Sequence, residues 1–187
     1  LSFGADWLGS WVSPVRYSVQ YGKMRSASSR GYVIHGESRM SMTAAAADTW
    51  LPTRPGTEGD VALAIANVVI DEGLASANEI TAFTRSLPSG ILNAYRPSDV
   101  ASRSGVPLEM IVKGGKRFGS SRPSVAFGGG SAGAHVHGTF ALSAIYALNT
   151  LVSAVGNTGG VRLNPTPPIS GLTGSSTGSS FAQWEEE

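Results

Sequence analysis

Apolar and polar positions alternate along the chain in segments that are typical of an α/β protein. Short apolar runs at residues 1–3, 31–35 and 124–127 are each followed by glycines or polar turn residues, which predicts buried strands. Between these runs, apolar residues recur at helical spacing, most clearly in the helix that starts at Thr57 and stops at Gly73. Strands that alternate with helices in this way favour a sheet that is largely parallel.

The helix boundaries are predicted from proline, capping residues and glycine. Ser13 is expected to cap a helix that begins at Pro14 and ends at Gly22. Thr57 is expected to cap the longest clear helix, where Glu58 also places negative charge in the first turn. The remaining predicted elements are a helical turn at residues 43–48, an extended piece at 49–51, and helices at 98–103, 108–118 and 136–155.

The composition fits a globular domain with an unusually uncharged surface. Hydrophobic residues make up 41% of the 187 residues, whereas charged residues make up only 14%. An average soluble domain has about 25% charged residues, so much of this surface is expected to be covered by a larger assembly. The net charge of +1 argues against a nucleic-acid partner. Because the chain has no cysteine, it offers no disulfide, no thiolate nucleophile and no sulfur-ligated metal or iron–sulfur centre.

One domain is predicted over residues 1–163, followed by a linker or arm over residues 164–187. The second segment is rich in proline, glycine, serine and threonine and ends in three glutamates. No apolar run reaches the roughly 20 residues that a membrane-spanning helix needs. The first residues have the pattern of a strand in progress and not that of a signal peptide. We therefore expect the chain to be an excerpt of a larger multidomain subunit.

A glycine-rich turn suggests a nucleotide site that the rest of the sequence does not support. Gly128, Gly130 and Gly133 have the G-x-G-x-x-G spacing of a dinucleotide-binding turn. No acidic residue lies between Glu109 and Glu185 to hold a ribose. A glycine turn that packs a helix on a strand is therefore favoured over a self-contained NAD site.

Two histidines form a second motif of this kind. His135 and His137 have the spacing of a metal-binding pair, but the third histidine, His35, is distant in the sequence. A metal site needs three or four ligands, so these side chains are expected to cap backbone groups or to contact a neighbour. No G-x-S-x-G motif is present, which leaves a hydrolase of the nucleophile-elbow type without its serine.

Three loops follow predicted strands or precede a helix, where an open α/β sheet binds its ligands. The first loop is suited to phosphate or sugar, the second to ribose hydroxyls, and the third to the N–H edge of guanine. Taken singly, each loop also has an ordinary explanation as a turn or a helix cap. The candidate binding residues are Gly4, Ala5 and Asp6 in the first loop, Glu37, Ser38 and Arg39 in the second, and Arg54, Gly56, Thr57 and Glu58 in the third.

The third loop belongs to a longer motif. Residues 47–59, ADTWLPTRPGTEG, resemble the AD-x-WLP-x-RPGTD signature of the molybdopterin oxidoreductase family. That family includes formate dehydrogenases, nitrate reductases and dimethyl sulfoxide reductase. Later landmarks at residues 104–107, 128–130 and 147–160 are similar as well, so the resemblance covers about residues 1–168.

The resemblance implies a Rossmann-like three-layer domain that contacts a molybdopterin guanine dinucleotide carrying Mo or W. In that arrangement residues 4–6 lie near the phosphates, Glu37 near a ribose and Glu58 near the guanine. The metal-binding residue and the cluster cysteines lie upstream in the family, so this chain alone is expected to catalyse nothing and to bind no cofactor. The implied partners are the other domains of the parent subunit and the iron–sulfur and membrane subunits of a redox complex. The periplasmic face of the membrane is favoured over the cytoplasm.

The chain departs from the family pattern at three carboxylates. Asp6 stands where the family has Asn, Glu37-Ser38 where it has Asp-Pro, and Glu58 where it has Asp. A charge at Asp6 repels pyrophosphate, and the extra methylene changes where each glutamate reaches. Residues 4–9 together with 13–15, and the Glu37-Ser38 pair, are more similar to the large iron–sulfur subunit of alternative complex III, a quinol-oxidising membrane complex that keeps the fold without the cofactor.

Three functional hypotheses are left open by the sequence. The chain is a cofactor-binding module of a molybdopterin oxidoreductase, or a cofactor-free scaffold module in an electron-transfer assembly. The third hypothesis is a stand-alone nucleotide-binding protein. It predicts that the chain binds GDP with a dissociation constant below about 1 mM.

Overall fold

The computed structural model describes residues 1–85, 87–162 and 164. The linker predicted over residues 164–187 lies outside the described residues, apart from Asn164. In the described part of the chain, no helix is both long enough and apolar enough to cross a lipid bilayer.

Four short strands form a sheet at the centre of the molecule. They are β1 (Ser2–Phe3), β2 (Ile34–Glu37), β3 (Thr49–Pro52) and β4 (Phe127–Gly128). Their order is β3-β2-β1-β4, and every neighbouring pair is parallel. The predicted α/β fold with a parallel sheet is therefore confirmed. Because the strand order reverses at β1, the loops that follow β1 and β4 meet at the topological switch point.

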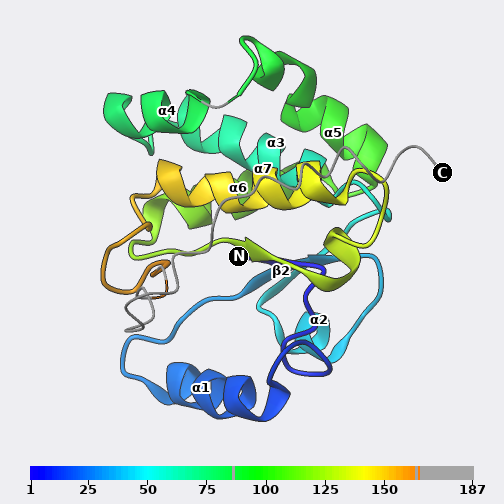
Figure 1. The fold of residues 1–187 in the computed structure, drawn as a ribbon, viewed down its shortest axis with the longest axis vertical. Helices are drawn as coiled ribbons and strands as arrows, with labels where there is room; N and C mark the ends of the chain where they lie inside the picture. Colours follow the sequence, from blue (N-terminus) through cyan, green and yellow to red (C-terminus); the bar gives the residue numbers. More distant parts are fainter. Residues whose placement is uncertain (86, 163, 165–187) are drawn as a thin grey trace, which may run out of the picture.

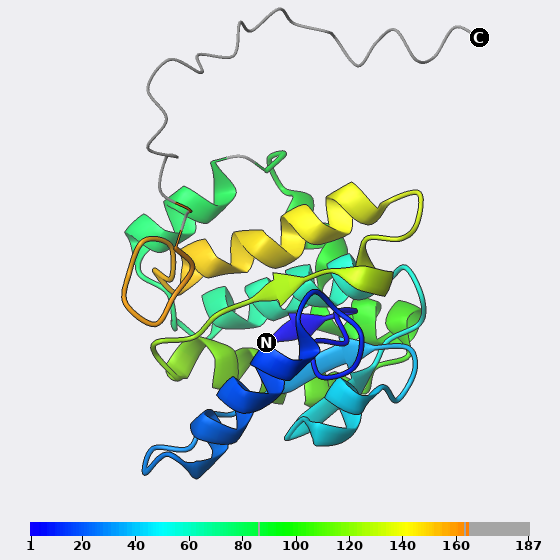
Figure 2. The same ribbon diagram turned by 60° about the horizontal axis from the view of Figure 1, so that its bottom comes forward.

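Helices cover both faces of this sheet, which gives three layers (Figure 1). The first face, called the α3 face below, carries α3 (Glu58–Asp71), α6 (Leu108–Ser120) and α7 (Gly138–Leu151). The opposite face, called the α1 face, carries α1 (Pro14–Ser26) and α2 (Met42–Ala46), which lie in front in Figure 2. Outside α3 and α7 lie α5 (Pro97–Ser104) and α4 (Ala77–Thr84). Two short 3-10 helices span Ile91–Tyr95 and Gly130–Ala132.

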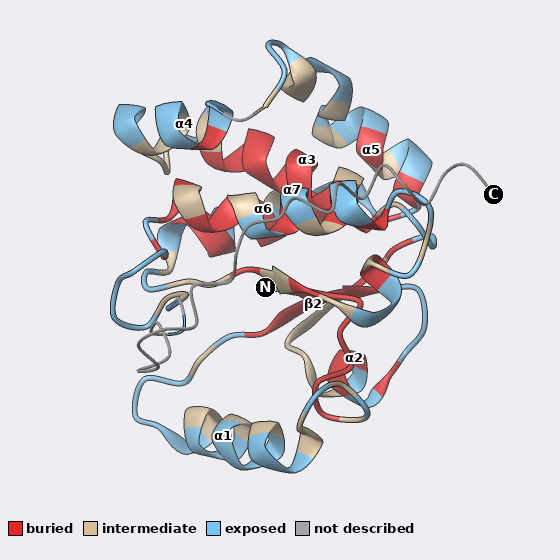
Figure 3. Cartoon of the chain, viewed as in Figure 1, coloured by how far each residue is buried: buried red, intermediate tan, exposed pale blue. Residues whose placement is uncertain are grey.

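The main hydrophobic core lies on the α3 face, around α3 itself. Leu63 and Ile65 are completely buried there, and burial of each such side chain contributes about 1.5–3 kcal/mol. A Cβ atom at Gly59 would lie 2.7 Å from the Cα of Ala141, so α3 and α7 approach each other at backbone distance. Figure 3 shows the difference between the faces: α3 is buried over most of its length, whereas α1 contains no buried residue.

The structure corrects three details of the predicted helices. α1 does not end at Gly22 but continues to Ser26, because helical backbone geometry carries through the glycine. Ser13 precedes α1 and Thr57 precedes α3, yet neither side chain makes the predicted capping hydrogen bond. The Thr57 hydroxyl instead donates to the carbonyl of Arg54 at 2.7 Å and closes the preceding turn.

Two of the predicted strands are displaced toward the C-terminus. β2 spans Ile34–Glu37, so Gly36 and Glu37 belong to the strand and not to the turn that was predicted there. Gly36 is suited to this position because a Cβ atom would lie 2.4 Å from the ring of Phe3. The strand predicted at residues 124–127 is likewise β4 at Phe127–Gly128.

The remaining differences concern the helices of the second half of the chain. α7 spans Gly138–Leu151 and is shorter at both ends than the predicted helix at residues 136–155. α4 and the 3-10 helix at Ile91–Tyr95 were not predicted from the sequence. α4 begins with a capping box in which Ser76 and Glu79 satisfy each other's backbone N–H groups, so the local signal was present.

Candidate functional site

The carboxyl edge of the sheet brings the three predicted loops together with a fourth. Residues 4–6 follow β1, Glu37 is the last residue of β2, and residues 53–57 follow β3. The loop after β4, residues 129–137, reaches the same edge because all four strands are parallel. The resulting site contains three carboxylates, those of Asp6, Glu37 and Glu58.

The loop after β1 is packed directly against the loop after β4. Gly4 has φ of 64°, a conformation that favours glycine, and a Cβ atom there would lie 2.3 Å from the backbone nitrogen of Ala132. The Gly4 carbonyl accepts a hydrogen bond from the Ser131 N–H at 3.2 Å, and the Gly129 N–H donates to the Phe3 carbonyl at 3.1 Å. The crevice at the switch point is therefore filled by the backbone of the chain itself.

Trp11 covers the same crevice. A Cβ atom at Gly129 would lie 2.7 Å from the indole nitrogen of Trp11, so the glycine leaves room for this ring. The indole also stacks on Phe127 and on Tyr17, with ring centroids 5.8 and 6.0 Å apart. Sequence reasoning did not assign Trp11 to the site, because nothing in its local sequence shows where the ring lies.

Asp6 is almost completely buried and its carboxylate is used inside the protein. One oxygen accepts hydrogen bonds from the backbone N–H of Thr43 at 3.1 Å and from the Thr43 hydroxyl at 2.9 Å. The other oxygen pairs with Arg39 at 3.4 Å. The Asp6 carbonyl also accepts from the N–H groups of three following residues, which shapes the turn. Ala5, before it, is completely buried.

Glu37 is also buried and fully engaged. One carboxylate oxygen pairs with His35 Nε2 at 3.2 Å, and the other pairs with Arg39 at 3.3 Å. Burial lowers the pKa of His35, which favours the neutral ring. Since the carboxylate only accepts, we infer that Nε2 of His35 carries the proton and Nδ1 accepts from Ser2, 2.8 Å away. Ser38, the next residue along the chain, is exposed.

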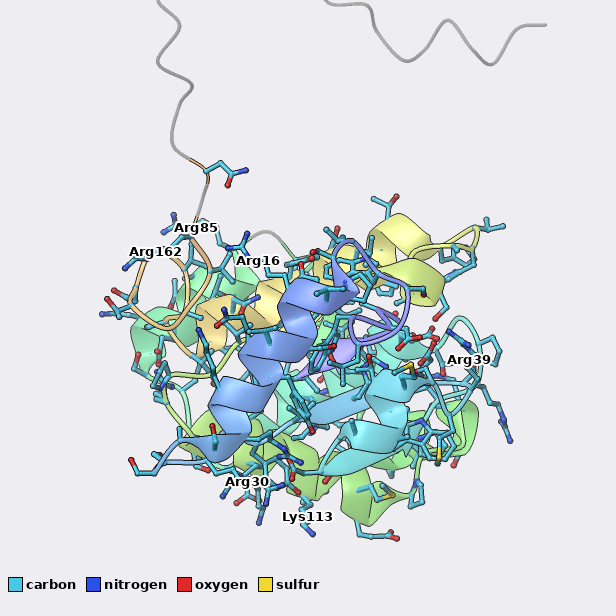
Figure 4. All side chains as sticks on the ribbon, turned by 90° about the horizontal axis from the view of Figure 1, so that it is seen from below. Arg16, Arg30, Arg39, Arg85, Lys113 and Arg162 are labelled. Atoms are coloured by element: carbon cyan, nitrogen blue, oxygen red, sulfur yellow. The ribbon has the colours of Figure 1, made fainter. Side chains whose placement is uncertain are left out.

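Arg39 connects the two carboxylates from outside. Its side chain is 66% exposed and reaches both Asp6 and Glu37. Figure 4 shows Arg39 at the edge of the molecule. The two loops that were predicted to bind phosphate and ribose are therefore joined to each other.

The loop after β3 contributes one residue to the site and uses the others for structure. Arg54 turns away from the edge and donates to the carbonyls of Ser102 and Arg103 at 3.1 and 2.9 Å, so it binds the end of α5. Gly56 has φ of 82°, as a tight turn requires. Glu58 points inward at the start of α3 and is 1% exposed.

Glu58 has an unpartnered oxygen, which distinguishes it from Asp6 and Glu37. Among the described residues, three side-chain atoms are buried without a hydrogen-bond partner: Oε2 of Glu58, Nε2 of His135 and Oγ1 of Thr53. Burial raises the pKa of Glu58, while hydrogen bonds from backbone N–H groups and the nearby His135 oppose this rise. A cavity of about 310 Å³ lies beside the loop and is lined by Gly56, His135 and His137 among others.

The glycine-rich turn and the histidine pair, the two motifs that the sequence left without a ligand, lie at the end of β4 and in the loop that follows it. The Nδ1 atom of His135 accepts from the His137 backbone N–H at 3.2 Å, so this ring does cap a backbone group, as predicted. In the part of the chain that the structure describes, no group of three or more histidines, aspartates or glutamates is placed to hold a metal ion. The spaced glycines lead into the 3-10 helix Gly130–Ala132 and not into α7, unlike a dinucleotide-binding turn.

Comparison with known proteins supplies several relatives. The chain is 31% identical over 170 residues to the menaquinone reductase molybdopterin-binding-like subunit of Nitratidesulfovibrio vulgaris, covering 88% of this chain and 23% of that protein. It is 29% identical over 173 residues to the arsenate respiratory reductase molybdopterin-containing subunit of Chrysiogenes arsenatis, covering 79% and 20%. No family model matches the chain.

A solved structure has a similar fold. Acetylene hydratase from Pelobacter acetylenicus superposes with a TM-score of 0.64 at 23% identity, covering 84% of this chain and 21% of that one. At this identity the similarity concerns the fold alone. The chain thus spans about a fifth of the length of the relatives that it matches.

Proposed function

Because this chain is homologous to one region of molybdopterin-containing oxidoreductase subunits, we propose that it is a cofactor-free structural module of such a large subunit. One observation carries the proposal: the Asp6 and Glu37 carboxylates are already bound by Thr43, His35 and Arg39. In this role the module holds its neighbours in an electron-transfer assembly and leaves the chemistry to them.

The residues at the sheet edge do not fit a bound dinucleotide as they stand. A ribose hydroxyl needs an accessible carboxylate oxygen, whereas the Glu37 side chain is buried and Arg39 and His35 already occupy one acceptor position on each of its oxygens. A pyrophosphate would meet the Asp6 carboxylate at the turn after β1, where like charges repel. The crevice between β1 and β4 is occupied by the contact of Gly4 with Ala132.

A second candidate is the binding of a molybdopterin guanine dinucleotide, carrying Mo or W, in the parent subunit. The unpartnered Oε2 of Glu58 favours it, because a carboxylate oxygen accepts from the N–H edge of guanine. In this second candidate, residues 4–6 lie next to the phosphates and Glu37 lies next to a ribose. Arg39 must then break its ion pairs with Asp6 and Glu37.

The remaining expectations belong to the same proposal. The other domains of the parent subunit and separate iron–sulfur and membrane subunits are its partners. The periplasmic face of the membrane is its location, and the Pro/Gly/Ser-rich segment 164–187 is a linker. The relative named menaquinone reductase molybdopterin-binding-like subunit is compatible with the scaffold role, as is the resemblance to alternative complex III.

The metal and pterin content of the intact subunit tests the proposal. We expect neither molybdenum nor tungsten by mass spectrometry and no fluorescent oxidised pterin in the same sample. The Asp6→Asn variant should also lack pterin, because the buried Glu37 and the close packing of Gly4 against Ala132 still block the carboxyl edge of the sheet. Near-stoichiometric metal with pterin in the unchanged subunit would overturn the scaffold role and favour the second candidate.

The stand-alone nucleotide-binding hypothesis has its own test. A ligand that binds only the folded chain raises the melting temperature, by an amount that grows with its concentration. We expect no shift of the melting temperature of the 187-residue chain with several millimolar GDP. A shift that saturates would restore that hypothesis.

A further inference from the structure

We infer that the outer side of α1 is a docking surface for an acidic helix supplied by the rest of the large subunit. This inference rests on the proposed place of the chain in a longer protein. Val15 is 78% exposed and Val19 is 53% exposed, on a helix that buries none of its residues. Val12, directly before the helix, is 76% exposed.

The exposed valines form one stripe, on the side of α1 that faces away from the sheet. Val15, Val19 and Gly22 follow one another at intervals of four and three residues, which places them on one side of an α-helix. Tyr17 and Tyr21 lie on the other side, where they pack against Trp11 and Trp7. The contacts to the body of the protein therefore leave the valine stripe uncovered.

Gly22 leaves the stripe without a side chain at one point, where a second helix could pack closely against α1. Glycine inside a helix costs about 1 kcal/mol relative to alanine, so a reason for its presence is needed. A Cβ atom at Gly22 would meet nothing within 4 Å, which means that no contact inside the described chain requires the glycine. A second helix crossing at this point would approach the backbone closely.

The backbone before α1 is strained in a way that supports the same surface. Val12 has φ of 53°, a conformation that β-branched residues rarely adopt. This conformation places an apolar side chain in solvent at the end of the stripe, although many residues would fit an exposed turn better. Strained residues of this kind cluster at ligand clamps and other functional sites.

Charge indicates the chemistry of the partner. α1 carries Arg16, Lys23 and Arg25 and no acidic residue. Arg25 pairs with Asp48, whereas Arg16 and Lys23 have no ion pair among the described residues. Figure 4 looks onto α1 and shows Arg16 beside it. An apolar stripe with these two cations along one side fits a helix that presents aspartates or glutamates beside its own apolar side.

Two other occupants fit less well. A second copy of this chain would bring Arg16 and Lys23 against the same cations across a two-fold axis, where like charges repel. A membrane surface is bound by helices with larger apolar groups such as Trp, Phe and Leu on the buried side, which this stripe lacks. The homologous subunits are four to five times longer than the matched region, so they provide the segment that the surface needs.

Photo-crosslinking in the intact subunit tests the inference. Benzoylphenylalanine is placed at position 15 or 19 on the stripe, and at position 20, which is exposed but off the stripe, as the control. We expect positions 15 and 19 to crosslink to one helical, acid-rich segment of the same subunit, with about tenfold lower yield at position 20. Crosslinks to lipid, to the α1 peptide of a second copy, or with equal yield at position 20 would overturn it.

A charge-reversal pair sharpens this experiment. The double variant Arg16→Glu/Lys23→Glu should reduce the crosslink from position 19 about tenfold, the effect of 1.4 kcal/mol. The matched control Arg85→Glu/Lys113→Glu makes the same change of net charge on other elements, at the end of α4 and on α6, and should leave the yield unchanged. Equal losses in both variants would contradict a specific docking surface. Metal content measured on the same sample tests the scaffold role separately.

Discussion

The two faces of the sheet are built in different ways. On the α3 face, apolar helices bury nearly everything that they turn toward the strands, and α3 and α7 meet at backbone distance. On the α1 face, α1 buries no residue, and the space near the carboxyl edge is occupied by polar contacts of Asp6, Glu37 and Arg39. The larger core therefore lies on the α3 face, whereas the α1 face has a smaller apolar cluster around Trp7 and Val33 and leaves the outer side of α1 exposed.

The largest expected contrast is between a core residue on the α3 face and an exposed one on the α1 face. Leu63→Ala should lower the free energy of unfolding by about 2–5 kcal/mol, since it leaves a cavity beside completely buried neighbours. Val15→Ala, on the exposed stripe, should change it by less than about 0.5 kcal/mol. Urea denaturation followed by circular dichroism measures both. Similar losses would show that α1 is part of the core.

A smaller effect is expected from the polar contacts at the sheet edge. Asp6→Ala should lower the free energy of unfolding by about 1–3 kcal/mol, because it leaves the buried N–H and hydroxyl of Thr43 without an acceptor. Asp6→Asn keeps one acceptor oxygen, so it should lower the free energy of unfolding by clearly less than Asp6→Ala. If both variants unfold like the unchanged chain, the carboxylate does not organise the edge.

Next in size is the glycine inside α1. Gly22→Ala should raise the free energy of unfolding by up to about 1 kcal/mol in the 187-residue chain, because alanine favours the helix and has open space around it. Thermal unfolding by circular dichroism is sufficient to detect this. A loss of stability would mean that α1 ends at Gly22 in solution, as the sequence pattern predicted.

The smallest effect is a change in the pH dependence at Glu58, where α3 meets the sheet edge. The folded chain raises the pKa of this carboxyl above 4.5, so the folded state keeps a proton that the unfolded state releases. Stability therefore falls as the pH rises from 4.5 through the folded pKa. Glu58→Gln should remove this fall.

The control for Glu58 is an exposed glutamate on another helix. Glu109→Gln removes a carboxyl in the first turn of α6 and should leave the pH profile parallel to that of the unchanged chain. Melting temperatures between pH 4 and 8, measured for both variants, make the comparison. A profile of Glu58→Gln that also runs parallel would contradict the raised pKa.

The sequence predicted well where the signal was local. The apolar pattern of α3 and the stop at Gly73, which has φ of 66°, lie within a few residues of one another, and the structure has α3 at Glu58–Asp71. α4 was not predicted, although Ser76 and Glu79 form a capping box, because a helix of eight residues carries only a short apolar pattern. Gly36 was interpreted as a turn, since only the ring of Phe3, 33 residues away, explains a glycine inside β2.

The candidate site was predictable in part for the same reason. Parallel strands bring their carboxyl ends to one edge, so the grouping of Asp6, Glu37 and Glu58 followed from the predicted topology. His35, Thr43 and Trp11 were not assigned to it. Thr43 and Trp11 contact groups far away in the sequence, and no local pattern encodes which groups these are. His35 lies two residues before Glu37 on the same strand, so its contact with Glu37 is local and was overlooked.

The alternation of apolar segments, the turn glycines and the absence of cysteine were by themselves enough to determine a parallel α/β sheet without sulfur chemistry of its own. Only the tertiary structure decided that Asp6 and Glu37 face Arg39 and Thr43, and that the outer stripe of α1 stays uncovered. The physical reason is the distance along the sequence over which the two kinds of interaction act. Secondary structure depends on neighbours within a few residues, whereas the partner of a buried charge is chosen by packing across the whole chain.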